Sequence, residues 1–345
     1  MTKVGVVGLG MMGMTHLDVY AKRASAQGDV QVVAVADLDE ARRTGKATAG
    51  GNIEGQAQGG FDFSSVKAYA DAADLIADPE VDLVDVCLPT PAHARFAIAA
   101  MEAGKHLLIE KPLARTSEQA EKIITAAENA EGLTMCAMCM RFWPGWTWLK
   151  DAVDKQTYGR VLSATFRRVA EHPGGAFYRN GDACGGAILD LHIHDTDFVQ
   201  YLFGMPNAVR SCGYSNTTGH IDHVTTQYYF DGHDKPSLVT AEGGWSMAMG
   251  FGFQMEYMVN FENCTAVFDL AAEKPLKIFQ AGQSAVFIPL PTGMGYEHEI
   301  SYFLNCIAHG TSPARVTLAS AAKSVSLIEA EIQSIQTDKH VVVRA

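Results

Sequence analysis

The feature that most restricts the fold of this 345-residue chain is a glycine pattern directly behind its first apolar run. The run "KVGVVGLG" predicts a buried strand, and Gly8, Gly10 and Gly13 follow the spacing G-x-G-x-x-G into a helix-like segment. The first glycine permits a tight turn, the second lets the backbone approach a pyrophosphate, and the third allows close packing of helix on strand. The unpaired amides of a helix N-terminus favour phosphate groups. We therefore predict a dinucleotide-binding domain.

Strand-like and helix-like segments alternate through the first third of the chain. The runs "VQVVAVAD", "VDLVDVCLP" and "HLLIE" are typical of strands buried on both faces, and helical segments separate them. Such alternation predicts right-handed βαβ units and a parallel sheet. The glycine-rich segment Ala49–Gly60 interrupts the pattern, and we expect a surface loop there.

The character of the sequence changes after about residue 125, where strands follow one another without helices between them. In "FQMEYMVNF" the apolar side chains alternate, which places Phe253, Met255, Tyr257, Val259 and Phe261 on one face. Successive strands of this kind predict a large, mostly antiparallel sheet with one open face. We therefore expect an α/β fold: a Rossmann domain over residues 1–122 and an α+β substrate-binding and oligomerisation domain over 123–345, with a C-terminal helix able to pack back on the first domain.

Composition and charge exclude several classes of protein. A net charge of −12 argues against nucleic acid or an anionic membrane as a partner. No stretch approaches the roughly 18 apolar residues of a membrane span, and the chain enters its first strand without a secretory signal. Seven scattered cysteines predict buried, reduced thiols in the cytoplasm. Cys136 and Cys139 have CxxC spacing but no second pair, so we predict no zinc site.

The residue that ends the second predicted strand bears on the choice of coenzyme. Asp37 stands where a carboxylate accepts hydrogen bonds from a ribose 2′-hydroxyl and repels a 2′-phosphate. This predicts NAD as the cofactor. Arg42 and Arg43 follow in the next helix-like segment and could reach a 2′-phosphate, so NADP stays open.

Two further segments concentrate ionisable residues. "IEKPLA" ends a parallel strand with Glu110-Lys111-Pro112, at the edge where doubly wound sheets bind ligands. "GGAILDLHIHDTD" places Asp190 and His194 four residues apart, on one helical face. Together with the glycine fingerprint, and in this order, these segments resemble the glucose–fructose oxidoreductase / inositol dehydrogenase (Gfo/Idh/MocA) family over nearly the whole chain.

The resemblance implies positions for the cofactor and the substrate. In such enzymes the lysine that corresponds to Lys111 lies near the nicotinamide and the reacting hydroxyl, and its peptide bond to proline is often cis. The implied cofactor-binding residues are Gly8, Gly10, Met11, Met12, Gly13, Asp37, Pro89, Thr90, His93, Glu110 and Lys111. The implied substrate-binding residues are Lys111, Arg141, His172, Asp190, His194 and Tyr296.

Four neighbours of the second motif need separate interpretations. Cys184 replaces the first residue of what is commonly a triple-glycine turn, and we expect a small-for-small exchange. His192 replaces a frequent glycine, and it diverges from His194 by about 200° on a helix. We therefore predict no metal site, and we expect His192 to pack or hydrogen-bond off the catalytic face. Asp195 and Asp197 are expected to brace the fold, for instance by pairing with an arginine.

The combined residues predict oxidation of a secondary alcohol. His194 would be the acid–base group because histidine titrates near the working pH. Lys111 would polarise the substrate oxygen and share its proton, and Asp190 would position both. We predict an NAD(P)-dependent oxidoreductase acting on the CH–OH group of a sugar, cyclitol (inositol-like) or sugar derivative, assembled as a homodimer or homotetramer through the C-terminal sheet. An NAD-dependent glycoside hydrolase and a non-catalytic dinucleotide-binding sensor remain alternatives.

Overall fold

The computed structural model of the protein describes residues 1–47 and 60–343, so nearly all of the loop expected at Ala49–Gly60 lies outside the described residues. The chain divides into two compact units, Met1–Cys139 with Met294–Ala322, and Met140–Gly293 with Lys323–Ala345. The expected boundary at residues 122/123 therefore moves to 139/140. The physical reason is that strand β6 (Thr134–Ala137) pairs in parallel with β5 (His106–Glu110) and so completes the first sheet.

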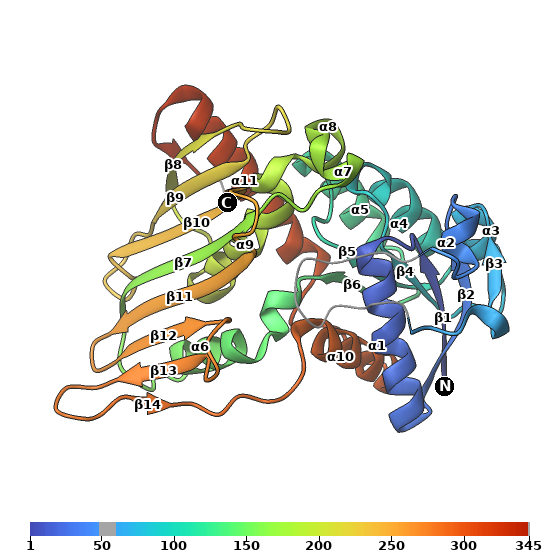
Figure 1. The fold of residues 1–345 in the computed structure, drawn as a ribbon, viewed down its shortest axis with the longest axis horizontal. Helices are drawn as coiled ribbons and strands as arrows, with labels where there is room; N and C mark the ends of the chain where they lie inside the picture. Colours follow the sequence, from blue (N-terminus) through green and yellow to red (C-terminus); the bar gives the residue numbers. More distant parts are fainter. Residues whose placement is uncertain (48–59, 344–345) are drawn as a thin grey trace. The chain divides into compact units, whose positions relative to one another are not determined.

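The first unit is built on a six-stranded sheet with the order β3-β2-β1-β4-β5-β6 (Figure 1). All of its pairings are parallel, as predicted. The order reverses between β1 and β4, which is the switch point where doubly wound sheets bind ligands. Its remaining strands are β1 (Thr2–Val7), β2 (Val30–Ala36), β3 (Lys67–Tyr69) and β4 (Leu83–Val86), and its helices are α1 (Met11–Gln27), α2 (Glu40–Arg43), α3 (Ala72–Ala77), α4 (His93–Glu102), α5 (Ser117–Ala127) and α10 (Gly295–His309), with short 3-10 turns at Phe63–Ser65 and Thr90–Ala92.

The second unit contains a nine-stranded sheet with the order β14-β13-β12-β11-β7-β10-β9-β8-β15. Every neighbouring pair is antiparallel except β7 and β10, so the predicted mostly antiparallel sheet is confirmed. The strands are β7 (Val161–Glu171), β8 (Ala208–Tyr214), β9 (His223–Tyr229), β10 (Leu238–Met247), β11 (Phe253–Phe261), β12 (Thr265–Asp269), β13 (Leu276–Phe279), β14 (Val286–Phe287) and β15 (Val341–Val342). The helices are α6 (Pro144–Asp154), α7 (Gly175–Arg179), α8 (Gly181–Cys184) and α9 (Ile193–Phe203), with a 3-10 turn at Cys139–Phe142 and a π-helical turn at Ile188–His192, and α11 (Leu318–Thr337) enters this unit at Lys323.

An aromatic cluster around Trp146 forms the core of the second unit. Trp146 comes from α6, and its ring centroid lies 4.7 Å from that of Phe198 on α9 and 5.4 Å from that of Tyr257 on β11. Phe166 and Phe268 extend the cluster to β7 and β12. These contacts fix α6 and α9 on one face of the sheet. The predicted alternation in β11 is confirmed for four of its residues, which are all buried: Met255, Tyr257, Val259 and Phe261.

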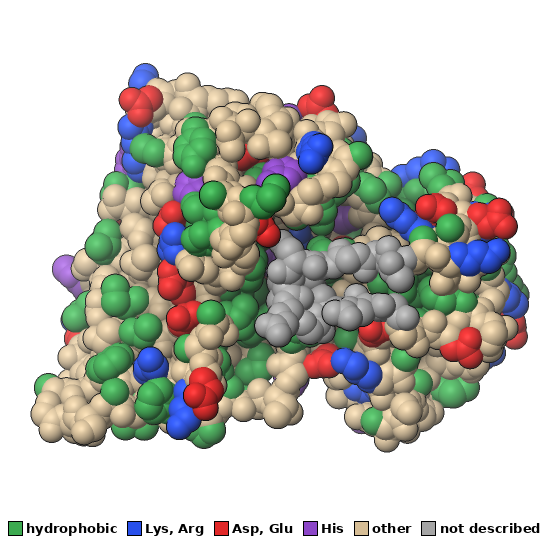
Figure 2. Space-filling view, in the orientation of Figure 1, with side chains coloured by type: hydrophobic (Ala, Val, Ile, Leu, Met, Phe, Trp, Pro, Cys, Tyr) green, Lys and Arg blue, Asp and Glu red, His purple; other side chains and the backbone are tan. Residues whose placement is uncertain are grey.

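The opposite face of this sheet is not covered by helices of the same unit. Leu162, Leu238 and Met258, on β7, β10 and β11, are each more than two-fifths exposed. Arg167 crosses the same face and donates to Glu242 at 2.9 Å and to Glu256 at 3.1 Å. Figure 2 shows the outer surface of these strands as a mixture of hydrophobic side chains and charges of both signs. The predicted open face is present.

Two other features bear on the classes that the sequence excludes. The helices described for this chain are all too short or too polar for a membrane crossing. Five of the seven cysteines are buried, as expected, whereas Cys87 is half-buried and Cys212 is exposed.

The aromatic cluster yields a stability test. We expect Phe198→Ala to lower the free energy of unfolding by about 3–5 kcal/mol, because the side chain is fully buried and its removal leaves a cavity. Phe279→Ala is the matched control, since Phe279 is 45% exposed and its loss should cost less than about 1 kcal/mol. Urea unfolding followed by tryptophan fluorescence measures both values. Equal losses in the two variants would contradict this assignment of the core.

Candidate functional site

The glycine fingerprint forms a tight turn between β1 and α1. Gly8 has a φ of +90°, and a Cβ atom there would lie 2.7 Å from the carbonyl oxygen of Cys87. A Cβ on Gly13 would lie only 1.9 Å from the carbonyl oxygen of Gly8. Gly10, the N-cap of α1, has open space where its Cβ would be. The turn therefore leaves a free approach to the helix N-terminus, as a bound pyrophosphate requires.

Asp37 is held against this turn. Its Oδ2 accepts a hydrogen bond from the backbone N–H of Leu9 at 2.8 Å, and its Oδ1 accepts one from Asp39 N–H at 2.8 Å. Arg42 approaches the Asp37 carboxylate at 4.0 Å, and Arg43 donates to the carbonyl oxygens of Asp37 and Leu38. Both arginines therefore contact groups of this same segment, and a carboxylate stands at the position that a 2′-phosphate would approach.

The loop after β4 is fastened by His93. One ring nitrogen lies 2.8 Å from the carbonyl oxygen of Pro112 and the other 2.7 Å from that of Leu88. His93 is almost fully buried, as is Thr90, whereas Pro89 is exposed. The ring of His93 thus ties two loops together inside the unit. Both ring nitrogens face backbone carbonyls, and the place of His93 in a loop that borders the nicotinamide stays a prediction.

The Glu-Lys-Pro segment lies at the carboxyl end of β5. The Lys111–Pro112 peptide bond is cis, as the family resemblance implies, and Lys111 is half-buried. Glu110 is buried, and its Oε2 accepts a hydrogen bond from the backbone N–H of Lys111 at 2.9 Å. Its Oε1 lies 3.2 Å from Nε2 of His16. Glu110 therefore points into the first unit, and its contact with the cofactor stays a prediction.

The ionisable residues of the second motif differ in their burial. Asp190 and His194, the predicted catalytic pair, are half-buried, whereas His192, Asp195 and Asp197 are essentially inaccessible to solvent. The last two are paired with arginines, as predicted: Arg168 donates to Asp195 at 2.9 and 3.2 Å, and Arg141 donates to Asp197 at 2.8 and 2.7 Å. The two aspartates brace α9.

His192 is fully buried, in agreement with the expectation that it packs inside the protein. Its Nε2 lies 3.2 Å from Oε2 of Glu331 on α11, and the other carboxylate oxygen of Glu331 accepts from Thr196 and Tyr228. The turn Ile188–His192 is π-helical, a rare geometry that is frequent at functional sites. The sequence did not indicate this π-turn or the role of Glu331, although the substitution of a frequent glycine by His192 was a signal.

The remaining predicted substrate contacts are distributed as follows. Arg141 is buried, and its Nε and Nη2 donate to Asp197, while its contact with the substrate stays a prediction. His172 accepts from Gly174 N–H at 3.0 Å through Nδ1, and its Nε2 lies 3.1 Å from the carbonyl oxygen of Tyr178. Tyr296 lies on α10 in the first unit and is buried.

Cys184 is fully buried beside Ala170, Ala187 and Trp245. Its place in this tight cluster agrees with the expected small-for-small exchange.

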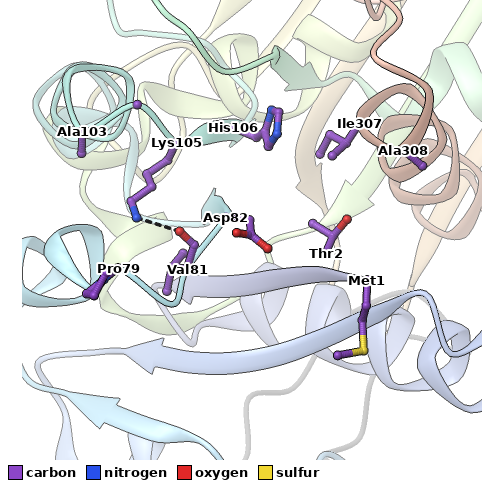
Figure 3. Close-up of a pocket in the computed structure, with 11 residues that line it drawn as sticks. Met1, Thr2, Pro79, Val81, Asp82, Ala103, Lys105, His106, Ile307 and Ala308 are labelled. Atoms are coloured by element: carbon purple, nitrogen blue, oxygen red, sulfur yellow. Dashed lines mark hydrogen bonds between the residues drawn. The ribbon is translucent and has the colours of Figure 1, made fainter.

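A surface pocket lies at the amino-terminal ends of the strands of the first sheet (Figure 3). It is lined by residues at the amino-terminal ends of β1 and β5 and the carboxyl end of α10, among them Thr2, Asp82, His106 and Ile307. Lys105 beside it donates to the carbonyl oxygen of Val81 at 2.7 Å. Ligands of doubly wound sheets bind at the carboxyl ends of the strands, so we do not assign this pocket to the candidate site.

Comparison with protein families and curated proteins gives consistent likenesses. Residues 2–137 match the family described as "Oxidoreductase family, NAD-binding Rossmann fold", and residues 146–267 match the "GFO/IDH/MocA C-terminal domain". The chain is 30% identical over 214 residues to levoglucosan dehydrogenase of Pseudarthrobacter phenanthrenivorans, covering 60% of this chain and 53% of that protein. It is 33% identical over 205 residues to myo-inositol 2-dehydrogenase of Thermotoga maritima, covering 59% and 55%. The match spans about half the length of these relatives.

Solved structures extend the likeness of the fold to the whole chain. A complex of levoglucosan dehydrogenase with NADH and levoglucosan superposes with a TM-score of 0.83 over 100% of both chains, at 22% identity. An NAD-binding oxidoreductase from Klebsiella pneumoniae gives the same TM-score at 20% identity, over 100% of this chain and 99% of that one. At these identities the likeness establishes a shared two-domain fold.

The contact of His192 with β10 provides a test of the buried support for the π-turn. A Cβ on Gly243 would lie 2.4 Å from Nδ1 of His192, which has no room to move. We expect Gly243→Ala to destabilise the protein by about 1–3 kcal/mol through overpacking. In a His192→Gly background the same change should cost far less, because the clashing ring is gone. Thermal or urea unfolding of the four proteins measures the coupling, and strictly additive losses would contradict the contact.

Proposed function

Because the chain belongs to the Gfo/Idh/MocA family of oxidoreductases, we propose that it is an NAD-dependent dehydrogenase that oxidises a secondary hydroxyl group of a sugar, cyclitol or sugar derivative to a ketone. The proposal rests on the difference in solvent exposure among the ionisable side chains of the second motif. Asp190 and His194 are partly exposed to solvent, whereas Asp195 and Asp197 form buried ion pairs with arginines. A motif with only a structural task would not need the accessible acid–base pair.

The proposed chemistry assigns one task to each group. NAD, when bound, supplies the hydride acceptor, and Gly8, Gly10, Gly13 and Asp37 would hold it. His194 takes the hydroxyl proton, because an imidazole can accept a proton near neutral pH. The ammonium group of Lys111 stabilises negative charge on the substrate oxygen and shares the proton. Asp190, one helical turn before His194, orients the imidazole.

The substrate class is supported by the relatives and by the residues near the second motif. The two curated relatives are named for levoglucosan and myo-inositol, which are both polyhydroxylated rings. We propose His172 and Tyr296 as further substrate contacts. His172 would use its ring face, since both nitrogens bind backbone groups and the ring lies 5.6 Å from that of Trp245. A sugar ring has an apolar C–H face that packs on such aromatic surfaces.

Assembly and compartment are proposed on separate observations. The open face of the nine-stranded sheet combines exposed Leu162, Leu238 and Met258 with the Arg167 ion pairs, so we propose that it is the face through which a homodimer or homotetramer forms. The predominantly buried cysteines support the proposal of a reducing, cytoplasmic location.

The proposed activity predicts NADH formation when the purified protein receives NAD and a panel of cyclitols, anhydrosugars, aldoses and sugar acids. Lys111→Ala and His194→Ala should each lower kcat by about 10²-fold or more, the usual contribution of a positioned acid–base group. Lys122→Ala, on the exposed surface of α5, is the matched control and should be neutral. Turnover within a few-fold of wild type in both site variants would contradict the proposal. A silent panel combined with tight NADH binding would favour a hydrolase or a sensor.

The proposed cofactor preference rests on Asp37. We expect the wild-type protein to bind NADH more tightly than NADPH, and Asp37→Ser to weaken NADH binding about tenfold or more through loss of hydrogen bonds to a charged acceptor. Asp39→Ser is the control, because that exposed carboxylate caps α2 through Ala41 N–H and pairs with Arg42 but does not bind the glycine turn. Fluorescence titration with both coenzymes measures the ratio. A wild-type preference for NADPH of tenfold would contradict the assignment.

A further inference from the structure

A buried chain of ionisable side chains lies behind Lys111 in the first unit. His16, on α1, is fully inaccessible to solvent. Its Nδ1 lies 2.8 Å from Oδ2 of Asp85 on β4, and its Nε2 lies 3.2 Å from Oε1 of Glu110 on β5. A carboxylate therefore faces each nitrogen of one imidazole ring, and none of these three groups has an assigned catalytic task in the proposed mechanism.

The imidazolium form of His16 fits these contacts. It presents an N–H to Asp85 at 2.8 Å and a positive charge to the Glu110 carboxylate, which lies within ion-pair distance of Nε2 without hydrogen-bond geometry. Burial lowers the pKa of His16, but the charge of the adjacent Asp85 carboxylate and its hydrogen bond to the ring more than offset burial, and the pKa of His16 lies well above its ordinary value. The net direction agrees with the contacts.

The other titratable groups that face the ring are neutral. Tyr20 donates to Asp85 at 2.9 Å, and Cys87 donates to the same carboxylate at 3.4 Å. Burial raises the pKa of both the Tyr20 phenol and the Cys87 thiol, so neither is ionised near neutral pH.

Glu299, on α10, is the last member of the group. It is fully buried within reach of His16 and Glu110, and its carboxylate has no hydrogen-bond partner among residues 1–47 and 60–343. Burial and the neighbouring Glu110 raise the pKa of Glu299 well above its ordinary value, which favours its protonated, uncharged form. His16 then lies between the carboxyl groups of Asp85 and Glu110.

Glu110 connects this group to the proposed catalytic lysine. One of its oxygens faces His16, and the other accepts the backbone N–H of Lys111 at 2.9 Å. One oxygen of the carboxylate is therefore hydrogen-bonded to the Lys111 amide, and the other lies at ion-pair distance from the His16 ring. Loss of the imidazolium would free one oxygen and leave two uncompensated buried negative charges behind Lys111.

We propose that His16 is a positioning residue for Lys111: as a buried imidazolium it holds the Glu110 carboxylate against the Lys111 amide and offsets one of the two negative charges behind that lysine. This inference rests on the proposed role of Lys111. An uncompensated anion nearby would stabilise the protonated ammonium. Because Lys111 shares the substrate proton, it must be able to release it, and the charge on His16 keeps that release possible at the working pH.

The first test needs no turnover. In the full chain labelled with 15N-histidine, without coenzyme, the His16 ring should keep the doubly protonated pattern from pH about 6 to about 9, well beyond the ordinary titration of histidine. The resonances are assigned by their loss in His16→Gln. A neutral pattern for His16 at pH about 7 would overturn the proposal. Stoichiometric metal in the purified protein that is lost in His16→Gln would overturn it too, because the group would then hold a cation.

The second test measures the pH dependence of kcat/KM. In His16→Gln the alkaline limb, where the Lys111 ammonium is lost, should move to higher pH by about one unit, and in Glu110→Gln it should move to lower pH, as expected for removal of a nearby charge of either sign. His106→Gln is the matched control: His106 lies on the same strand, accepts from Leu133 N–H, and burial lowers its pKa, so that no charge is removed.

The outcomes separate this inference from the proposed function. An unmoved pH profile in His16→Gln, with only reduced stability, would show that His16 is merely structural and would overturn the inference. If no substrate is turned over, the proposed function fails, while the protonation state of His16 is still decided by the spectra.

Discussion

The close packing of α1 on the first sheet is the constraint on which the nucleotide-binding unit depends. The helix approaches so near that a single methyl group on Gly13 would collide with the carbonyl oxygen of Gly8. This approach directs the helix N-terminus at the turn, where its unpaired amides can receive phosphate oxygens. It also carries His16, one turn further along α1, into the interior between β4 and β5. The same packing thus serves cofactor binding on one side and support of Lys111 on the other.

In the second unit, buried ion pairs hold helix α9 in its orientation. The π-turn Ile188–His192 and helix α9 keep Asp190 and His194 accessible to solvent only if the opposite side of α9 is held in place. Arg141 and Arg168 do this through two-point contacts with Asp197 and Asp195. Pairs of this kind often add little net stability, since desolvation offsets their attraction, but their geometry is specific. We interpret them as devices that orient the helix.

Charge burial behind an accessible group is common to both halves of the proposed mechanism. Lys111 is backed by Glu110, His16 and Asp85, and the turn of Asp190 and His194 is backed by His192 and Glu331. The accessible members were predicted from the sequence because their spacing matches a reaction. The supporting members were not, with the exception of Asp195 and Asp197. A supporting residue has no characteristic spacing from the group it supports.

The sequence by itself determined the alternation of strands and helices, the parallel and antiparallel character of the two sheets and the glycine turn, and it supplied the proposed acid–base residues. These follow from periodicity and from local spacing, which the chain carries within a few residues. The tertiary structure alone decided the unit boundary after Cys139, the inward direction of Glu110, His93 and Arg141, and the partners of His16 and His192. Each of these depends on contacts between segments far apart in the chain, and a buried polar atom takes whichever partner the packing brings to it.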